Sequence, residues 1–410
     1  MVQFKAFPLR GRGTAVAVDE VYLVGGVMED RLKGFNKRKA ILFIIISIIA
    51  SRLLIFGIYK VFYSDVGTFS KLLNYADSNW YTEIVVDGYN GIPHTDGLTR
   101  YAFFPLYPLI IMALSKVLPF VNLHILTFFV SSLMTGLALY VSSKYLYITR
   151  KSNIAGYIFT LLMTFGAYTI YNSLFYTESL FFLLLILGLY FLEEKSYVKA
   201  GICGMFLSAT KMVGSLFVFA IIFKYVIEFF KDKKVTLKGF IELLKQAIKD
   251  YKFVFSVVIV PLGLTLFMLY LNKITGDPFA FIRAQKAWNR KIDFFSASRL
   301  MYALLNYKYT STPFLYAAMW IFCIILTAFS IERYKAIESV MCFVFLLTIL
   351  SQGELYSIGR FITGFIVYIL TLTDLIVKRK LFGKALFITM WSIIGIIGVF
   401  LVFNDSPAMY

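Results

Sequence analysis

The sequence predicts an all-α integral membrane protein, and three observations lead to that fold class. First, 60% of the 410 residues are hydrophobic and only 16% are charged, whereas a soluble domain averages about 25% charged residues. Second, the apolar residues gather in runs of about 20, which is the length that a helix needs to cross a bilayer. Third, basic residues cluster between these runs, as they do in multi-pass membrane proteins.

Composition also narrows the function. The formal net charge is +18, but the basic clusters lie between apolar runs, so we assign them to membrane topology and expect no nucleic-acid partner. The three cysteines lie in apolar runs and imply no disulfide framework. Two histidines are too few for a multi-histidine zinc site. We therefore expect no metal and no cofactor.

The chain divides into two unequal parts. Residues 1–36 contain no apolar run, and we expect an N-terminal extension that is disordered, with Met28 as an alternative start. Residues 37–410 form the polytopic membrane domain. Glycines within its runs, among them Gly136, Gly188 and Gly204, favour close helix packing in lipid.

We predict about eleven spanning helices. They cover residues 40–62, 121–148, 153–175, 178–192, 200–212, 214–230, 253–271, 313–331, 336–351, 360–377 and 385–403. Residues 103–118 contain Pro105, Pro108 and Lys116, so we interpret them as an interfacial helix in the first outer loop. With the N-terminus inside, nearly every basic cluster then lies in the cytoplasm, as the charge rule requires.

One basic segment breaks this rule. The predicted outer loop 272–312 holds seven basic and two acidic residues. A basic loop on the outer face is unfavourable for topology, so we expect it to bind an anionic ligand. Its candidate binding residues are Arg283, Gln285, Lys286, Trp288 and Arg290. The alternative is an amphipathic helix that only rests on the membrane surface.

Ionisable residues near the membrane are costly and are therefore candidates for function. Asp77 follows the first span and is our candidate general base; it could instead cap a helix, and Glu83 and Asp87 are rivals on the same segment. Glu178 starts a predicted span, where it could stabilise the helix end or hold a sugar hydroxyl.

Two cations complete the set of candidates. Lys211 interrupts an apolar stretch and could either extend to the interface or bind phosphate. Arg360 precedes a span and suits bidentate phosphate binding, although it could merely pair with Glu354 at the interface. Acids and bases gathered over one membrane face suit glycosyl transfer from a lipid phosphate, because the acid deprotonates the acceptor while the cations hold the leaving phosphate.

Several segments resemble the PIG-V family, the GPI mannosyltransferase II type, and its archaeal and bacterial relatives. They are 76–89, FFPLYP at 103–108, FYTESLF at 175–181, 276–278 with 285–288, and 357–361. The resemblance implies a GT-C glycosyltransferase that uses dolichyl-phosphate mannose with inversion. It implies that Asp77 is the base, with supporting roles for Glu178 and Arg360. The chain departs from the family pattern at Ala76, where tryptophan is usual, and at Lys211, where an arginine-containing segment is usual.

These observations lead to a hypothesis and two alternatives. The hypothesis is a membrane mannosyltransferase that transfers mannose from a polyprenyl-phosphate donor to a lipid-linked glycan on the extracytoplasmic face. That face belongs to the cell membrane in a prokaryote and to the endoplasmic reticulum in a eukaryote. The first alternative is a transporter or flippase of polyprenyl-linked sugars, which needs polar residues along a path through the membrane. The second is a scaffold subunit of a glycosylation complex.

Overall fold

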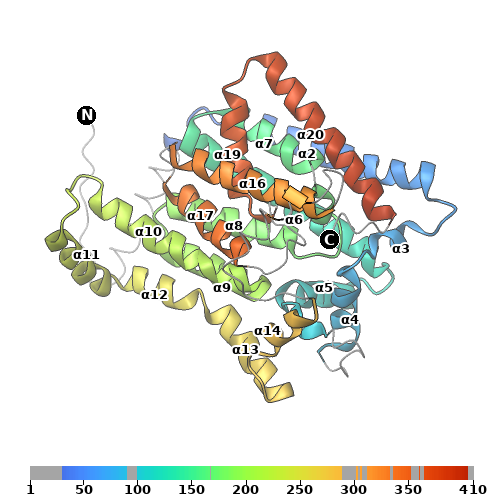
Figure 1. Ribbon diagram of the computed structural model, residues 1–410, viewed down its shortest axis with the longest axis horizontal. Coiled ribbons are helices and arrows are strands. Elements are labelled where there is room, and N and C mark those ends of the chain that lie inside the picture. The colour runs from blue at the N-terminus through green and yellow to red at the C-terminus, as the bar shows by residue number, and fades with distance from the viewer. Residues whose placement is uncertain are drawn as a thin grey trace, which may run out of the picture.

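The computed structural model describes residues 30–89, 99–166, 168–288, 302, 305–306, 312–332, 336–351, 360 and 364–404. Every regular element in these ranges is a helix, which confirms the all-α fold class. The helices form an elongated bundle in which α3 and α4 lie at one end and α11 lies at the other (Figure 1).

Five helical stretches are long and apolar enough to cross a membrane. They are α2 (Lys37–Phe62), α6 (Leu123–Arg150), η3 (Met212–Leu216) with α10 (Phe217–Phe230), α12 (Tyr251–Ile259) with α13 (Leu262–Thr275), and α20 (Leu381–Phe403). Two of them begin at asparagine caps. Asn36 accepts a hydrogen bond from the Lys39 amide, and Asn122 accepts from two amides of the first turn of α6.

A second set of apolar helices is shorter. It comprises α7 (Asn153–Phe165), α8 (Glu178–Glu193), α9 (Tyr197–Thr210), α17 (Ala336–Leu350) and α19 (Val367–Val377). Helix α16 (Thr312–Glu332) packs against α17 and α19. At 1.5 Å per residue the short helices measure roughly 16–24 Å, less than the ~30 Å of hydrocarbon in a bilayer. A helix of this length does not by itself span that thickness.

All eleven predicted runs contain helix, but one of the predicted spans is too long. Helix α7 ends at Phe165 instead of 175, because the indole of Trp391 donates to the Leu162 carbonyl and occupies the place of a side chain at Gly166. The chain continues through η2 (Thr169–Asn172) before α8 begins. In the predicted span 360–377, Arg360 and Gly364 are helical and the helix is interrupted at 365–366 before α19, while 361–363 lie outside the described residues. The predicted interfacial helix is α5 (Leu106–Val117).

A proline interrupts the crossing formed by α12 and α13. Pro261 separates the two helices, and the hydroxyl of Ser208 on α9 inserts at the break. This hydroxyl donates to the Val260 carbonyl (2.6 Å) and accepts from the Leu264 amide (3.2 Å), so it replaces one missing helical hydrogen bond. Gly201 and Gly204 of α9 let the helices approach closely enough for these contacts.

The first loop folds over one end of the bundle. It carries α3 (Phe69–Leu73), α4 (Ser78–Asp87), η1 (Arg100–Ala102) and α5. Arg100 closes the C-terminal end of α4, because its guanidinium contacts Glu83 (2.8 Å), Asp87 (3.3 Å) and the Gly88 carbonyl (3.0 Å). These contacts occupy the two carboxylates that rivalled Asp77 as candidate bases.

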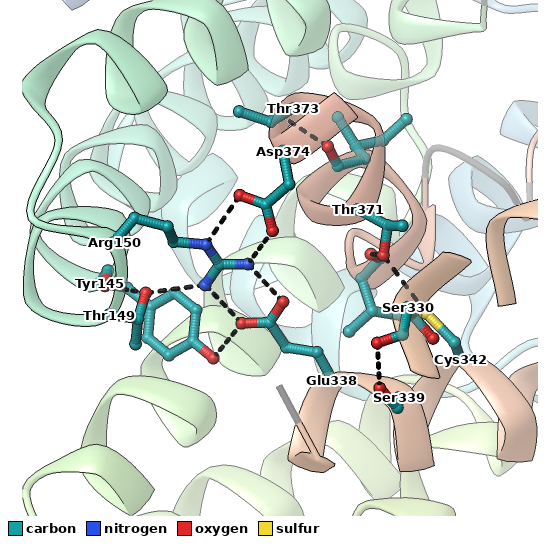
Figure 2. A network of polar contacts seen from close by, with 12 residues as sticks. Tyr145, Thr149, Arg150, Ser330, Glu338, Ser339, Cys342, Thr371, Thr373 and Asp374 are labelled. Carbon is teal, nitrogen blue, oxygen red and sulfur yellow. Dashed lines mark hydrogen bonds and ion pairs between the residues drawn. The ribbon is translucent and has the colours of Figure 1, made fainter. Parts of the chain in front are cut away.

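The opposite end of the bundle contains a buried ionic network centred on Arg150, the last residue of α6 (Figure 2). Its guanidinium binds both carboxylate oxygens of Glu338 on α17 (2.6 and 2.5 Å) and both of Asp374 on α19 (3.1 and 2.9 Å). The Tyr145 hydroxyl donates to Glu338 (2.6 Å). One arginine thus joins three helices.

Arg150→Ala is expected to lower the free energy of unfolding by about 3–5 kcal/mol, because it leaves the carboxylates of Glu338 and Asp374 buried without their cation. The measurement is unfolding by sodium dodecyl sulfate, followed by circular dichroism. Arg379→Ala is the control: Arg379 is exposed at the same end, and its loss should change stability by no more than about 0.5 kcal/mol. Equal effects of the two variants would contradict a central role for Arg150.

Candidate functional site

Four ionisable side chains from four separate segments meet near the end of the bundle that carries the first loop. Asp77 Oδ2 lies 2.6 Å from Arg360 Nη1. Arg360 Nε lies 3.5 Å from Glu178 Oε1, and Lys211 Nζ lies 2.8 Å from the same oxygen. We call these four residues the ionic cluster. They are the four residues predicted from the sequence as a base, an acid and two phosphate-binding cations.

Three members of the cluster stand where a helix starts or ends. Asp77 precedes α4, Glu178 is the first residue of α8, and Lys211 lies in extended conformation between α9 and η3. Non-helical backbone at membrane depth is tolerated where protein covers it or where it lines a water-filled cavity. The short helices therefore favour a recessed polar site at this position.

The loop before α4 fixes Asp77. The Tyr176 hydroxyl accepts a hydrogen bond from the Asp77 amide (3.0 Å) and donates one to the Tyr75 carbonyl (3.2 Å). Ala76 between them has a left-handed φ of 46°, which is unusual for a residue other than glycine. Asp77 occupies the N-cap position of α4, but its carboxylate makes no capping bond and binds Arg360 instead.

Aromatic rings surround the cluster. The guanidinium of Arg360 lies 5.3 Å from the ring centroid of Tyr176 and 5.9 Å from that of Tyr171. The Lys211 ammonium lies 5.6 Å from the ring of Phe181. Tyr81 packs edge-on against Tyr176 at 6.2 Å. Cation–π contacts of this kind help to hold the two cations in place beside their carboxylate partners.

The tyrosines of the site stay protonated. Burial raises the pKa of Tyr176 well above its ordinary value, and the charge of Asp77 raises it further. Burial also raises the pKa of Tyr81, with additional contributions from Glu178 and Asp77. Both hydroxyls therefore act as neutral hydrogen-bonding groups and not as bases.

Several buried polar atoms around the cluster are incompletely satisfied. Glu178 is only 2% exposed, yet within the described ranges its Oε2 has no hydrogen-bond partner. Within these ranges the hydroxyl oxygens of Ser78 and Ser173 also have no hydrogen-bond partner. Buried polar atoms normally have partners. This concentration of unsatisfied atoms beside the ionic cluster indicates a place that a polar ligand or water fills.

The candidates of the basic loop lie apart from the cluster. On α14 (Ala280–Gln285), Arg283 pairs with Asp277, and Gln285 donates to the Ala102 carbonyl (3.4 Å). Lys286 begins η4 (Lys286–Trp288) and is exposed. The side chain of Trp288 and all of Arg290 lie outside the described residues, as does Glu354.

An aromatic layer connects α14 with the ionic cluster. Phe281 of α14 packs against Phe104 (5.6 Å), the neighbour of Phe103, and Phe103 packs against Tyr81 (5.2 Å). The FFPLYP segment therefore lies between the basic loop and the cluster.

Sequence reasoning missed two kinds of residue. Tyr171 and Tyr176 border the cluster, and only their position beside Glu178 offered a signal. Arg52 lies in the middle of the first span, where a charge is itself a signal. It donates to the Ser132 hydroxyl (2.8 Å) and to the Asn172 carbonyl (3.2 Å), so it holds the loop between α7 and α8 that carries both tyrosines.

Within the described ranges no three His, Cys, Asp or Glu residues gather as a metal site would require.

No family model matches the chain, and no curated protein matches it.

The chain is similar in structure to the oligosaccharyltransferase of Archaeoglobus fulgidus. The apo form matches with 12% identity and a TM-score of 0.49, over 92% of this chain and 56% of that one. A form tethered to an acceptor peptide with the NVT sequon matches with 11% identity and a TM-score of 0.48. A complex with an inhibitory peptide and a dolichol-phosphate matches with 12% identity and a TM-score of 0.48. In both of these complexes the coverage is again 92% and 56%.

The chain thus spans about half the length of that enzyme, 56% of it. Similarity at this level assigns no family.

Tyr176→Phe is expected to destabilise the protein by about 1–3 kcal/mol, because the Asp77 amide and the Tyr75 carbonyl lose their shared partner. Unfolding in detergent measures this effect. Tyr168→Phe is the matched control, since in the described part of the chain the Tyr168 hydroxyl donates only to the Met319 sulfur, at 3.5 Å. A loss of stability in the control as large as in Tyr176→Phe would argue against the loop contact.

Proposed function

We propose that the protein is a multi-pass membrane glycosyltransferase of the GT-C type that transfers a sugar from a polyprenyl-phosphate donor to a lipid-linked glycan. The convergence of Asp77, Glu178, Lys211 and Arg360 carries this proposal. Two carboxylates and two cations in one largely buried cluster supply what the reaction needs: a base for the acceptor hydroxyl and positive charge for the departing phosphate.

The proposed reaction is a single displacement with inversion. The acceptor hydroxyl oxygen forms a bond to the anomeric carbon of the donor sugar, and its proton passes to the carboxylate of Asp77. The bond between the anomeric carbon and the phosphate oxygen breaks, and its electron pair leaves with the polyprenyl phosphate. Arg360 and Lys211 neutralise the charge that develops on this phosphate.

The existing ion pairs explain how the site accommodates a phosphate. Arg360 binds Asp77 (2.6 Å) in the structure, so an arriving phosphate competes with that carboxylate for the same guanidinium. Asp77 then gives up part of its stabilising contact, which favours its action as a base. Glu178 keeps both cations oriented, and its Oε2 is available to a sugar hydroxyl.

The finer parts of the proposal rest on other observations. A lipid-linked donor fits a recessed site among apolar helices, because its polyprenyl chain can remain in the bilayer while its phosphate reaches Arg360. Mannose and dolichyl phosphate come from the resemblance to the PIG-V family. The extracytoplasmic face comes from the distribution of basic clusters. We assign to Arg283, Lys286 and Arg290 the role of attracting the anionic donor. Gln285 and Trp288 belong to the same segment of the sequence.

An enzyme accounts for the charge distribution better than a transporter does. On α6 the Ser131 hydroxyl donates to the Leu174 carbonyl (3.2 Å), in the loop that carries Tyr176, and Arg150 lies 19 residues further along, about 28 Å along the helix axis. Apolar side chains such as Leu139, Leu185 and Leu189 are fully buried between the two ends. Within the described residues the ionic cluster and the network of Arg150 are thus separated by apolar packing and are not joined by a row of ion pairs.

Asp77→Asn is expected to abolish transfer, because an amide cannot accept the proton of the acceptor hydroxyl. The measurement is transfer from polyprenyl-phosphate mannose to lipid glycans by protein in detergent. The amide still accepts a hydrogen bond from Arg360, so the thermal midpoint should change little. Asp65→Asn, an exposed acid of the same loop, should retain wild-type turnover. Wild-type turnover by Asp77→Asn would exclude Asp77 as the base.

Arg360→Lys is expected to weaken donor binding roughly 10- to 150-fold, the loss of one hydrogen bond to a charged group, because lysine cannot form a bidentate contact with phosphate. Binding of polyprenyl phosphate is measured at equilibrium, in the Asp77→Asn background so that no transfer occurs. Arg379→Lys is the control and should bind as the parent does. Unchanged affinity in Arg360→Lys would reject the phosphate role of Arg360.

A further inference from the structure

Helix α11 (Leu237–Lys249) takes no part in the proposed reaction. It connects the C-terminal side of α10 with the start of α12 and lies at the end of the bundle opposite α3 and α4 (Figure 1). Thr236 caps its first turn by accepting from the Gly239 amide (3.1 Å). The helix is therefore a formed element with a defined start.

One face of α11 is apolar and uncovered by the described residues. An apolar stripe runs along the helix at helical spacing, formed by Leu237, Ile241, Leu244 and Ile248. Leu237 is 81% exposed, Leu244 60% and Ile248 76%. Leu243 packs inward and is buried. The apolar stripe thus points away from the body of the protein, and its length matches the whole helix.

A row of lysines flanks this stripe. Lys238, Lys245 and Lys249 repeat at the same spacing one residue after the apolar positions, and all three are exposed. A rotation of about 100° per residue places them beside the stripe and not opposite it. Segment 231–252 holds seven lysines and three acids. The surface around the stripe is therefore strongly basic.

The two ends of α11 fix its depth. Phe230, the last residue of α10, packs against Phe240 of α11 (5.1 Å), and α12 starts two residues after α11 ends. Both neighbours belong to stretches that are long and apolar enough to cross a membrane. A helix tied closely to two such stretches lies at the boundary between hydrocarbon and water, with its apolar stripe toward the lipid.

We propose that α11 is a binding surface for anionic phospholipid headgroups of the bilayer that holds this chain. Its stripe enters the hydrocarbon boundary, and Lys238, Lys245 and Lys249 extend along the surface to the lipid phosphates. Charge complementarity favours this occupant over a second copy of the chain, because two copies of α11 would bring like charges together. The proposal is independent of the reaction at the ionic cluster.

The test compares the full chain in nanodiscs of phosphatidylcholine with the full chain in nanodiscs that also contain phosphatidylglycerol. Hydrogen exchange of the amides of 237–249 is followed in each. Exchange should be slower with phosphatidylglycerol, and added salt should abolish the difference. Replacing Lys238, Lys245 and Lys249 by Gln should abolish the slowing as well. Each lost lysine should weaken binding of the anionic lipid roughly fivefold.

Two variants control the experiment. Lys378, Arg379 and Lys380 are equally exposed, and replacing all three by Gln removes the same charge while leaving the effect of phosphatidylglycerol intact. Leu244→Ser with Ile248→Ser should raise exchange in both kinds of disc, because the stripe then leaves the lipid boundary. Equal exchange with and without phosphatidylglycerol overturns the proposal. Protection that instead rises with protein concentration in detergent assigns the surface to a second copy and overturns it too.

Discussion

The fold and the site follow from the cost of placing charge and irregular backbone where hydrocarbon replaces water. Two groups of largely buried ionisable side chains have found partners: Asp77 and Glu178 with Arg360 at one end, Glu338 and Asp374 with Arg150 at the other. Removing one member of a buried pair costs far more than an exposed pair contributes. The helix ends are consequently fixed in space by charges drawn from distant parts of the chain.

The two ionic groups differ in a way that bears on function. Arg150 is saturated, with both of its carboxylate partners bound through two oxygens each. The cluster around Arg360 is bordered by unsatisfied hydroxyls and by a carboxylate oxygen without a described partner. A saturated network stabilises packing, whereas an unsaturated one leaves capacity for a ligand. This contrast supports our proposal that the cluster around Arg360 binds substrate, while the network of Arg150 holds helices together.

Much of this arrangement could be predicted from the sequence, but not its geometry. Apolar runs predicted the helices, and misplaced charges predicted Asp77, Glu178, Lys211 and Arg360. The shortening of α7 could not be predicted, since it depends on Trp391, which lies 229 residues from its partner Leu162. The role of Tyr176 could not be predicted either, because a hydroxyl that binds two backbone groups leaves no pattern along the chain.

The spacing of the ionic cluster along the chain has a consequence for biosynthesis. Lys211 precedes Arg360 by 149 residues. A ribosome that adds about 5–20 residues per second therefore needs roughly 7–30 s to synthesise the chain between them. During that interval Glu178 and Lys211 can already neutralise each other, while Asp77 still lacks its arginine. The last step in building the site is thus the insertion of the segment before α19, so a truncated chain would hold a stable half of the cluster with no competent centre.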